Sequence, residues 1–263
     1  MRYALLKIYY TLGTLKKDKS LINSSDVILK HLSEIYSDFS LKRFNLSFES
    51  FSFYSESNIK DDLIRLKNQS SELLQNFDCV LFLGGDHSIS YATISAFKEQ
   101  YQNGKVVIFD AHPDVESDFF ISHEDYLRIL INQNILSPSD VLLVGLRNAS
   151  KEEMDFLREK NIQYLSALDL YQNRKLNKQT NVQSFLKDVE EIHLSIDNDV
   201  FDFGFATGYY EPLGLSLFQF LSIIEQFKPK IKSVDIVEYY PSKDLNEINA
   251  KNLAKIIFHL FSE

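Results

Sequence analysis

The sequence is poor in cysteine and tryptophan. Cys79 is the one cysteine and no tryptophan is present, so an intramolecular disulfide is excluded. Cys79 precedes the apolar run 80–83, where a buried core thiol is expected. A zinc site built from several thiolates is also excluded, because such a site needs more than one cysteine.

The sequence also lacks a surplus of basic residues and long apolar runs. The formal net charge of −9 at pH 7 argues against a nucleic-acid-binding protein, which needs a clustered basic face. No window of about 18 uninterrupted apolar residues occurs. The apolar stretch in residues 1–20 is interrupted by Lys7 and lacks a small-residue cleavage site. Neither membrane insertion nor export is expected, and we expect a cytoplasmic protein.

Apolar runs and amphipathic segments alternate along the chain, which predicts a mostly parallel sheet with helices on both sides. Residues 1–263 contain no repeat and no Pro- or Gly-rich linker, so one α/β domain is expected. Residues 16–76 are the least informative part, and no function is assigned to them. The runs typical of buried strands are 79–83, 105–109, 141–144, 192–195 and 234–237. The helix-like segments are 61–75, 89–102, 124–134, 151–160, 217–227 and 246–261.

Polar residues that can carry chemistry follow several of the predicted strands. In DAHPD, three such residues stand at alternate positions, and alternate residues of an extended segment project to one side. The segment IDND repeats this spacing with two aspartates, and GGDHS supplies a histidine. Ligands of parallel sheets bind beyond the carboxyl ends of the strands, where these residues fall. The candidate ligands are His87, Asp110, His112, Asp114, Asp197 and Asp199.

Four carboxylates and two imidazoles form a donor set that suits hard or borderline divalent cations. Mn²⁺ is the natural candidate, with Zn²⁺, Co²⁺ or Ni²⁺ as competitors. Without cations, the carboxylates would repel one another and have raised pKa values. Any single aspartate of this kind is better explained as a loop or N-cap residue, but that explanation fails for the whole set.

Four segments resemble, in the same order, the signatures of the arginase, agmatinase and formimidoylglutamase family: GGDHS, DAHPD, SIDND and DIVEYYP. They span residues 84–241, and their joint occurrence is specific although each alone is weak. The resemblance implies a three-layer α/β/α sandwich around a mainly parallel sheet of about eight strands. It also implies a homo-oligomer, either a trimer or a hexamer. The segments SVDIVE and GLRNASKEE resemble the corresponding segments of agmatinase-type members more than those of arginases.

The resemblance further implies a site with two divalent cations. A water activated there would attack the trigonal carbon of a guanidinium or formimino group. Asp110 and Asp197 would bridge the two cations. The remaining ligands would be His87 and Asp114 for the first cation, and His112 and Asp199 for the second.

Two further positions take substrate roles from the same resemblance. Glu238, in SVDIVEYYP, resembles the glutamate that pairs with the substrate guanidinium. His123, in FISHEDYLRIL, resembles the histidine that relays protons to the leaving amine. Thr207 is expected to contact the substrate.

The loop after the second aspartate pair departs from the family pattern. Phe203 stands where proline would be expected, and Tyr209 and Tyr210 enter the loop 203–212. This departure changes the expected shape of the pocket mouth, and with it the substrate that the pocket would accept.

Another departure follows Asp114, where VESDFFIS lacks the Asn and Ser arrangement by which arginases hold the amino-acid end of arginine. Arginase activity is therefore disfavoured. Glu116 and Asp118 would repel a substrate carboxylate and attract an amine.

The leading hypothesis is an agmatinase-like hydrolase that releases urea from a guanidine-type substrate. One alternative is formimidoylglutamase or another hydrolase of linear amidines or guanidino acids. An alternative of another class is a catalytically silent family member that serves as a binding or assembly protein. Closure of the pocket by Phe203, Tyr209 and Tyr210 would favour the silent protein.

Five other polar residues are expected to lie outside the ligand set. Asp86 is either a partner that orients an imidazole or a cap residue. Arg147 is expected to have a structural role, in orienting loops or anchoring an oligomer interface. His31, His193 and His259 are expected to be packed or exposed histidines.

Overall fold

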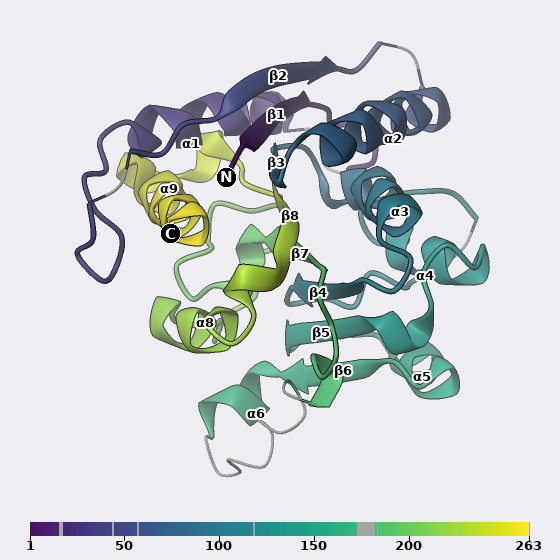
Figure 1. Cartoon of the computed structure of the whole chain (residues 1–263). Helices are drawn as coiled ribbons and strands as arrows, with labels where there is room; N and C mark the ends of the chain where they lie inside the picture. Colours follow the sequence, from purple (N-terminus) through teal and green to yellow (C-terminus); the bar gives the residue numbers. More distant parts are fainter. Residues whose placement is uncertain are drawn as a thin grey trace.

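The computed structural model describes residues 1–15, 18–43, 45–56, 58–117, 119–172, 182 and 184–262 (Figure 1). An eight-stranded sheet runs through the molecule in the order β2-β1-β3-β8-β7-β4-β5-β6, and each neighbouring pair is parallel. The strands are β1 (Tyr3–Tyr9), β2 (Glu49–Tyr54), β3 (Cys79–Leu83), β4 (Lys105–Phe109), β5 (Val141–Leu146), β6 (Gln163–Ser166), β7 (Ile192–Asp197) and β8 (Ile231–Val237).

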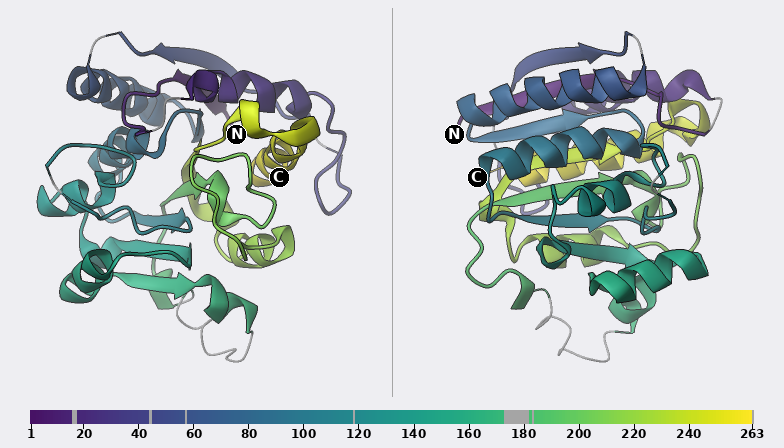
Figure 2. Two further views of the ribbon diagram at one scale, coloured as in Figure 1. Left: turned by 180° about the vertical axis from the view of Figure 1, so that it is seen from behind. Right: turned by 90° about the vertical axis from the view of Figure 1, so that its right-hand side faces the viewer.

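Helices cover both faces of this sheet (Figure 2). One face packs against α2, α3, α4 and α5, and the other against α1, α6, α8 and α9. The bounds are α1 (Ser24–Leu32), α2 (Ile59–Asn76), α3 (Ser90–Gln100), α4 (Tyr126–Asn132), α5 (Lys151–Lys160), α6 (Ala167–Tyr171), α8 (Leu217–Ile224) and α9 (Ile248–Phe261). The expected three-layer α/β/α sandwich with eight parallel strands is confirmed.

The central strands are apolar because both of their faces are covered. All residues of β3, β5 and β7 are buried, and alternate side chains enter two separate cores. In β3, for example, Leu81 and Leu83 pack with α9, whereas Val80 and Phe82 pack with α2 and α3. The sheet thereby forms a rigid platform whose carboxyl ends lie at one edge.

The helices begin where the sequence supplies caps. Ser150 accepts a hydrogen bond from the Glu153 amide while Glu153 accepts one from the Ser150 amide, which completes a capping box at α5. Ser216 and Gln219 repeat this arrangement at α8. The six helical segments expected from the sequence are confirmed within a few residues at each end.

Three strands were not predicted from the sequence, namely β1, β2 and β6. The segment 49–54 lies in the part of the chain to which no role was assigned. It forms an edge strand whose side chains are mostly exposed or half-buried, so it carries no continuous apolar run. Among the described residues, no helix combines the length and the apolar character needed to cross a membrane.

Candidate metal centre

The candidate ligands come from the carboxyl ends of strands that are neighbours in the sheet. The strands β3, β8, β7 and β4 stand side by side, and the segments that follow them converge at one edge. The segment after β8 adds Glu238 to this edge, because the Glu238 amide donates to the Gly85 carbonyl after β3 (3.1 Å). The strand order thus brings together residues that are up to 151 positions apart in the sequence.

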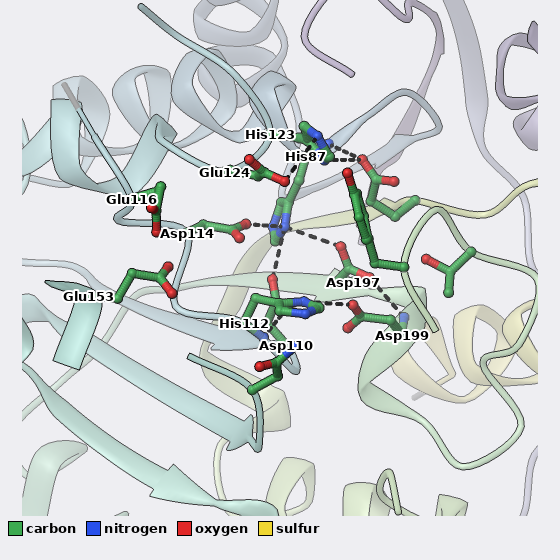
Figure 3. A pocket seen from close by; sticks show the side chains of 14 residues that line it. His87, Asp110, His112, Asp114, Glu116, His123, Glu124, Glu153, Asp197 and Asp199 are labelled. Carbon is green, nitrogen blue, oxygen red and sulfur yellow. Dashed lines mark hydrogen bonds and ion pairs between the residues drawn. The ribbon is translucent and has the colours of Figure 1, made fainter. Parts of the chain in front are cut away.

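His87 lies at the centre of the first group of candidate ligands (Figure 3). Its Nδ1 atom lies 3.0 Å from Oδ2 of Asp110, 2.9 Å from Oδ2 of Asp114 and 3.2 Å from Oδ2 of Asp197. Nδ1 of His87 and Oδ2 of Asp110 are both buried and make no hydrogen bond. A nitrogen and three carboxylate oxygens therefore face one another within 3.2 Å.

His112 forms a second group with Asp110 and Asp199. Its Nδ1 atom lies 3.0 Å from Oδ2 of Asp199 and 3.7 Å from Oδ1 of Asp110. Two sets of three donor atoms are close enough to hold a cation each, and Asp110 belongs to both: His87, Asp110 and Asp197 form one, and Asp110, His112 and Asp199 the other. The arrangement suits two neighbouring cations that share a carboxylate.

The buried carboxylates perturb one another's pKa values. Burial and the Asp110 charge raise the pKa of Asp114 to about 8. Burial, Asp199 and Asp110 raise the pKa of Asp197 well above its usual range. Burial opposes charge on His112, but Asp110 and Asp199 outweigh it and raise its pKa to about 12. Without cations the centre has to retain protons, so its donor chemistry fits divalent ions.

Glu238 and His123 face each other beside this centre. Oε1 of Glu238 accepts a hydrogen bond from the His87 amide (3.0 Å) and lies 3.6 Å from Nδ1 of His123. The Leu15 amide donates to Nε2 of His123 (3.4 Å), so the ring proton belongs on Nδ1, toward Glu238. Burial and then the charge of His87 lower the pKa of His123 to about 4, which favours a neutral ring.

Backbone strain accompanies two of these acidic residues. Asp114 and Glu238 have φ values of 55° and 57°, which lie in the left-handed region that residues other than glycine rarely adopt. Such strain persists only where the surrounding structure holds it, and it concentrates at functional sites.

The centre lies in a cavity of about 310 Å³. Among the described residues that line it, the charged ones other than histidine are all acidic, and neither lysine nor arginine is present. Thr207 and Tyr209 lie on its wall, and the Tyr209 ring lies 5.9 Å from that of His123. The full lining is His87, Asp110, His112, Asp114, Glu116, His123, Glu124, Asn148, Glu153, Asp197, Asp199, Thr207, Tyr209 and Glu238.

Every described residue expected at the site from the sequence lines this cavity. Asp118 lies outside the described residues. Sequence reasoning missed Glu124, Asn148 and Glu153 as lining residues. The capping pattern of Ser150 and Glu153 was the available local signal, but it explains a helix start and does not predict a pocket.

The aromatic residues of the departing loop do not close the pocket together. Phe203 stacks on Phe201 with ring centroids 4.6 Å apart and packs toward the core, and Tyr210 is about half exposed. Only Tyr209, of the three residues in question, lines the cavity. The loop therefore contributes Tyr209 to the cavity wall, and these three aromatic residues do not close the pocket.

Arg147 holds this loop against the centre. Its Nε donates to the Pro212 carbonyl (2.9 Å), and its Nη2 donates to the carbonyls of Glu211 (2.8 Å) and Asp199. The expected role in orienting loops is confirmed. Asp86 acts as a cap, since its carboxylate accepts from the Ser88 amide (3.1 Å).

The three other histidines lie away from the centre, as expected. His193 is buried between Ser233 (2.7 Å) and Asp235 (3.0 Å). His31 and His259 pair with glutamates on the face of the sheet that α9 covers.

Comparison with known proteins agrees with this fold. The profile described as Arginase family matches residues 24–262. The chain belongs to the arginase family. Members of this family are hydrolases that act on C–N bonds of linear amidines, and this chain is therefore a hydrolase of that class.

Individual relatives carry different names. An arginase of Staphylococcus aureus (strain COL) is 29% identical over 219 residues, which cover 76% of this chain and 72% of the relative. The formimidoylglutamase structure from Bacillus subtilis has a TM-score of 0.89 at 20% identity, covering 99% of this chain and 86% of that one. The agmatine ureohydrolase structure of Thermoplasma volcanium has a TM-score of 0.84 at 20% identity, covering 98% and 88%. At such identities the structures indicate the fold and leave the substrate open.

Proposed function

We propose that this chain is a dinuclear-metal hydrolase that releases urea from a guanidine with a cationic tail, in the manner of an agmatinase. The observation that carries the proposal is that, among the described residues lining the cavity, the charged ones other than histidine are all acidic. A substrate carboxylate would find neither lysine nor arginine among these residues, whereas an ammonium group would be attracted.

We assign the metal ligands from the resemblance to the arginase family; of the two bridging residues that it implies, Asp110 belongs to both groups of donor atoms and Asp197 to one. Asp110 and Asp197 would bridge two divalent cations, most simply Mn²⁺, with Zn²⁺, Co²⁺ or Ni²⁺ as competitors. The cations would supply charge that activates a water for attack on the guanidine carbon. The other ligands would be His87 and Asp114 for one cation and His112 and Asp199 for the second.

Glu238 is the residue that would receive the guanidinium. Its carboxylate is 4% exposed and accepts one backbone hydrogen bond from His87, which leaves acceptor capacity for a planar cation. Burial and then Asp86 raise its pKa to about 8, and an incoming guanidinium would favour the ionised form. Thr207, which lines the cavity, would contact the same group.

His123 would move the proton to the leaving amine. Its ring is buried beside Glu238, and the backbone amide of Leu15 fixes its orientation. The proton on Nδ1 of His123 would reach the amine nitrogen as the C–N bond breaks, and the proton released by the attacking water would replace it on the ring.

The tail of the substrate would point toward Glu116 and Glu153. Figure 3 shows these two carboxylates beyond Asp114, on the side away from Asp199. Glu116 accepts from the Ser150 hydroxyl (3.1 Å), and Glu153 accepts from the Ser150 amide (2.9 Å). Both carboxylates are thus held in place at the pocket wall and remain able to accept from an ammonium group.

A panel of substrates tests the proposal on Mn²⁺-loaded protein. We expect urea from agmatine, little from arginine, and no formamide from formimidoylglutamate. Arginase, which the sequence disfavours, becomes a second candidate because the S. aureus relative bears that name. Urea from arginine but none from agmatine would replace the proposal with that candidate. No product from any of the three would favour a silent binding protein.

A matched pair of variants tests the tail contact. Glu116→Gln combined with Glu153→Gln should lower kcat/KM for agmatine by about tenfold, because two carboxylates near the ammonium are neutralised. With butylguanidine, which lacks the ammonium, the loss should be less than about twofold. Glu152→Gln, an exposed neighbour outside the cavity, is the control. Equal losses with both substrates would contradict a tail contact.

A further inference from the structure

Tyr126 is a buried tyrosine on the side of His87 that faces away from the carboxylates. Its hydroxyl lies 3.0 Å from Nε2 of His87, and the Ser195 hydroxyl lies 3.1 Å from the same nitrogen. The rings of His87 and Tyr126 lie 4.6 Å apart. All three residues are at most 1% exposed, so water does not reach this contact.

The two nitrogens of His87 have different surroundings. Nδ1 faces three carboxylate oxygens within 3.2 Å, whereas Nε2 faces two hydroxyl groups. A neutral imidazole carries one proton, and a nitrogen that binds a cation must be the deprotonated one. If Nδ1 binds the cation, Nε2 carries the proton and needs an acceptor.

The hydroxyl oxygens are the acceptors that this geometry provides. Ser195 belongs to β7 and Tyr126 begins α4, so both are anchored in regular structure on either side of the ring. The Tyr126 ring also packs against the imidazole and limits its rotation. Removal of the hydroxyl groups would leave a buried N–H without a partner, which is costly in a protein interior.

We propose that Tyr126, together with Ser195, is a positioning residue that holds His87 in the tautomer with its proton on Nε2 and its Nδ1 lone pair toward the metal centre. This inference rests on the proposed function, since it concerns a ligand of that centre. Partners of metal-bound histidines typically change metal affinity about 10- to 100-fold when they are removed. Tyr126 does not touch substrate and is not a catalytic residue.

Two variants that preserve shape test the role. Tyr126→Phe keeps the ring and removes the hydroxyl, and Ser195→Ala removes the second acceptor. With Zn²⁺ as the probe and a colorimetric chelator as competitor, we expect about tenfold weaker binding at one site for Tyr126→Phe and about 100-fold for the double variant. Tyr91→Phe is the matched control, because the Tyr91 hydroxyl bonds Gln133 on the protein surface (2.8 Å).

A spectroscopic measurement distinguishes positioning from a general loss of stability. In ¹H–¹⁵N spectra of the Zn²⁺-loaded wild-type protein, His87 should carry its proton on Nε2. A proton on Nδ1 of His87 in this protein would overturn the proposal. Because this spectrum is recorded on the wild-type protein, the result holds even if the variants do not fold. Melting curves of the metal-free variants show whether they fold.

The outcomes also separate this inference from the proposed function. If wild-type protein binds two Zn²⁺ ions and the double variant binds them with equal affinity, the positioning role alone is wrong. If wild-type protein binds none, the metal centre and the role of Tyr126 fall together.

Discussion

The two halves of the candidate centre differ in how they are enclosed. The His87 side chain is 1% exposed and is held by buried hydroxyls, whereas the His112 side chain is 24% exposed. Nε2 of His112 faces Glu211 on the departing loop at 3.6 Å, too long for a hydrogen bond. A histidine ligand whose ring is already held by buried hydrogen-bond partners loses less conformational entropy on binding a cation than a ligand that is partly exposed. We therefore expect the His87 half to bind its cation more tightly.

The largest effect is expected where the two halves meet. Asp110→Asn removes the carboxylate that both donor groups share, so metal content should fall from two ions per chain to fewer than one. Loss of the metal-derived charge should lower kcat by about 10³-fold or more. Metal analysis and urea release would measure both. Asp202→Asn, at an exposed aspartate outside the cavity, serves as the control. Two retained ions in Asp110→Asn would refute a shared ligand.

Variants confined to one half should separate two binding phases. Asp199→Asn affects the His112 group and should remove the weaker phase of a Mn²⁺ calorimetric titration. Asp114→Asn affects the His87 group and should weaken the tighter phase. Each should lower kcat/KM by about 100-fold, since hydrolysis needs both ions. Loss of the tight phase in Asp199→Asn would reverse the assignment of the two halves.

Metal removal should make stability depend on pH in a defined direction. Asp114 has a pKa of about 8 in the metal-free fold, above its usual 3.8, so the fold binds the additional proton. The contribution of Asp114 to the free energy of unfolding is fully present below about pH 4 and is lost as the pH rises through about 8. Metal binding requires deprotonated ligands and strengthens over the same range.

The melting temperatures of stripped and Mn²⁺-loaded protein should therefore diverge between pH 4 and pH 8. The stripped protein should melt at progressively lower temperature as pH rises. Differential scanning calorimetry on both forms measures the gap. A stripped protein that becomes more stable toward pH 8 would contradict the raised pKa.

The smallest effect is expected at Glu211. Glu211→Gln removes the charge that faces His112, while Arg147 continues to hold the Glu211 carbonyl (2.8 Å). Affinity for the weaker Mn²⁺ ion should fall by about threefold or less, because the pair is long and partly exposed. A loss as large as that expected for Tyr126→Phe would remove the distinction between the two halves.

The parts predicted from the sequence were those with a local signal. The buried strands β3, β4, β5, β7 and β8 are continuous apolar runs, and the segments after them carry the candidate ligands at fixed spacing. The edge strand β2 carried no such signal, because its side chains are mostly exposed or half-buried. The count of one domain stays a prediction, as do the oligomeric state and the roles of the site residues.

The parts that escaped prediction depend on strand order. Tyr126 and Ser195 meet at His87 from positions 39 and 108 residues away, and no local pattern links them. Leu15 reaches His123 because β1 lies beside β3, which the sequence did not indicate. Glu153 was explained locally by its helix cap, so its place on the pocket wall emerged only from the fold.

The most direct test of the account is the number of metal ions bound by the intact chain. Protein dialysed against Mn²⁺ and then analysed by mass spectrometry should hold two ions per chain, and the Asp110→Asn variant fewer than one. One ion per chain would contradict the dinuclear centre, and none in wild-type protein would contradict a metal-dependent hydrolase.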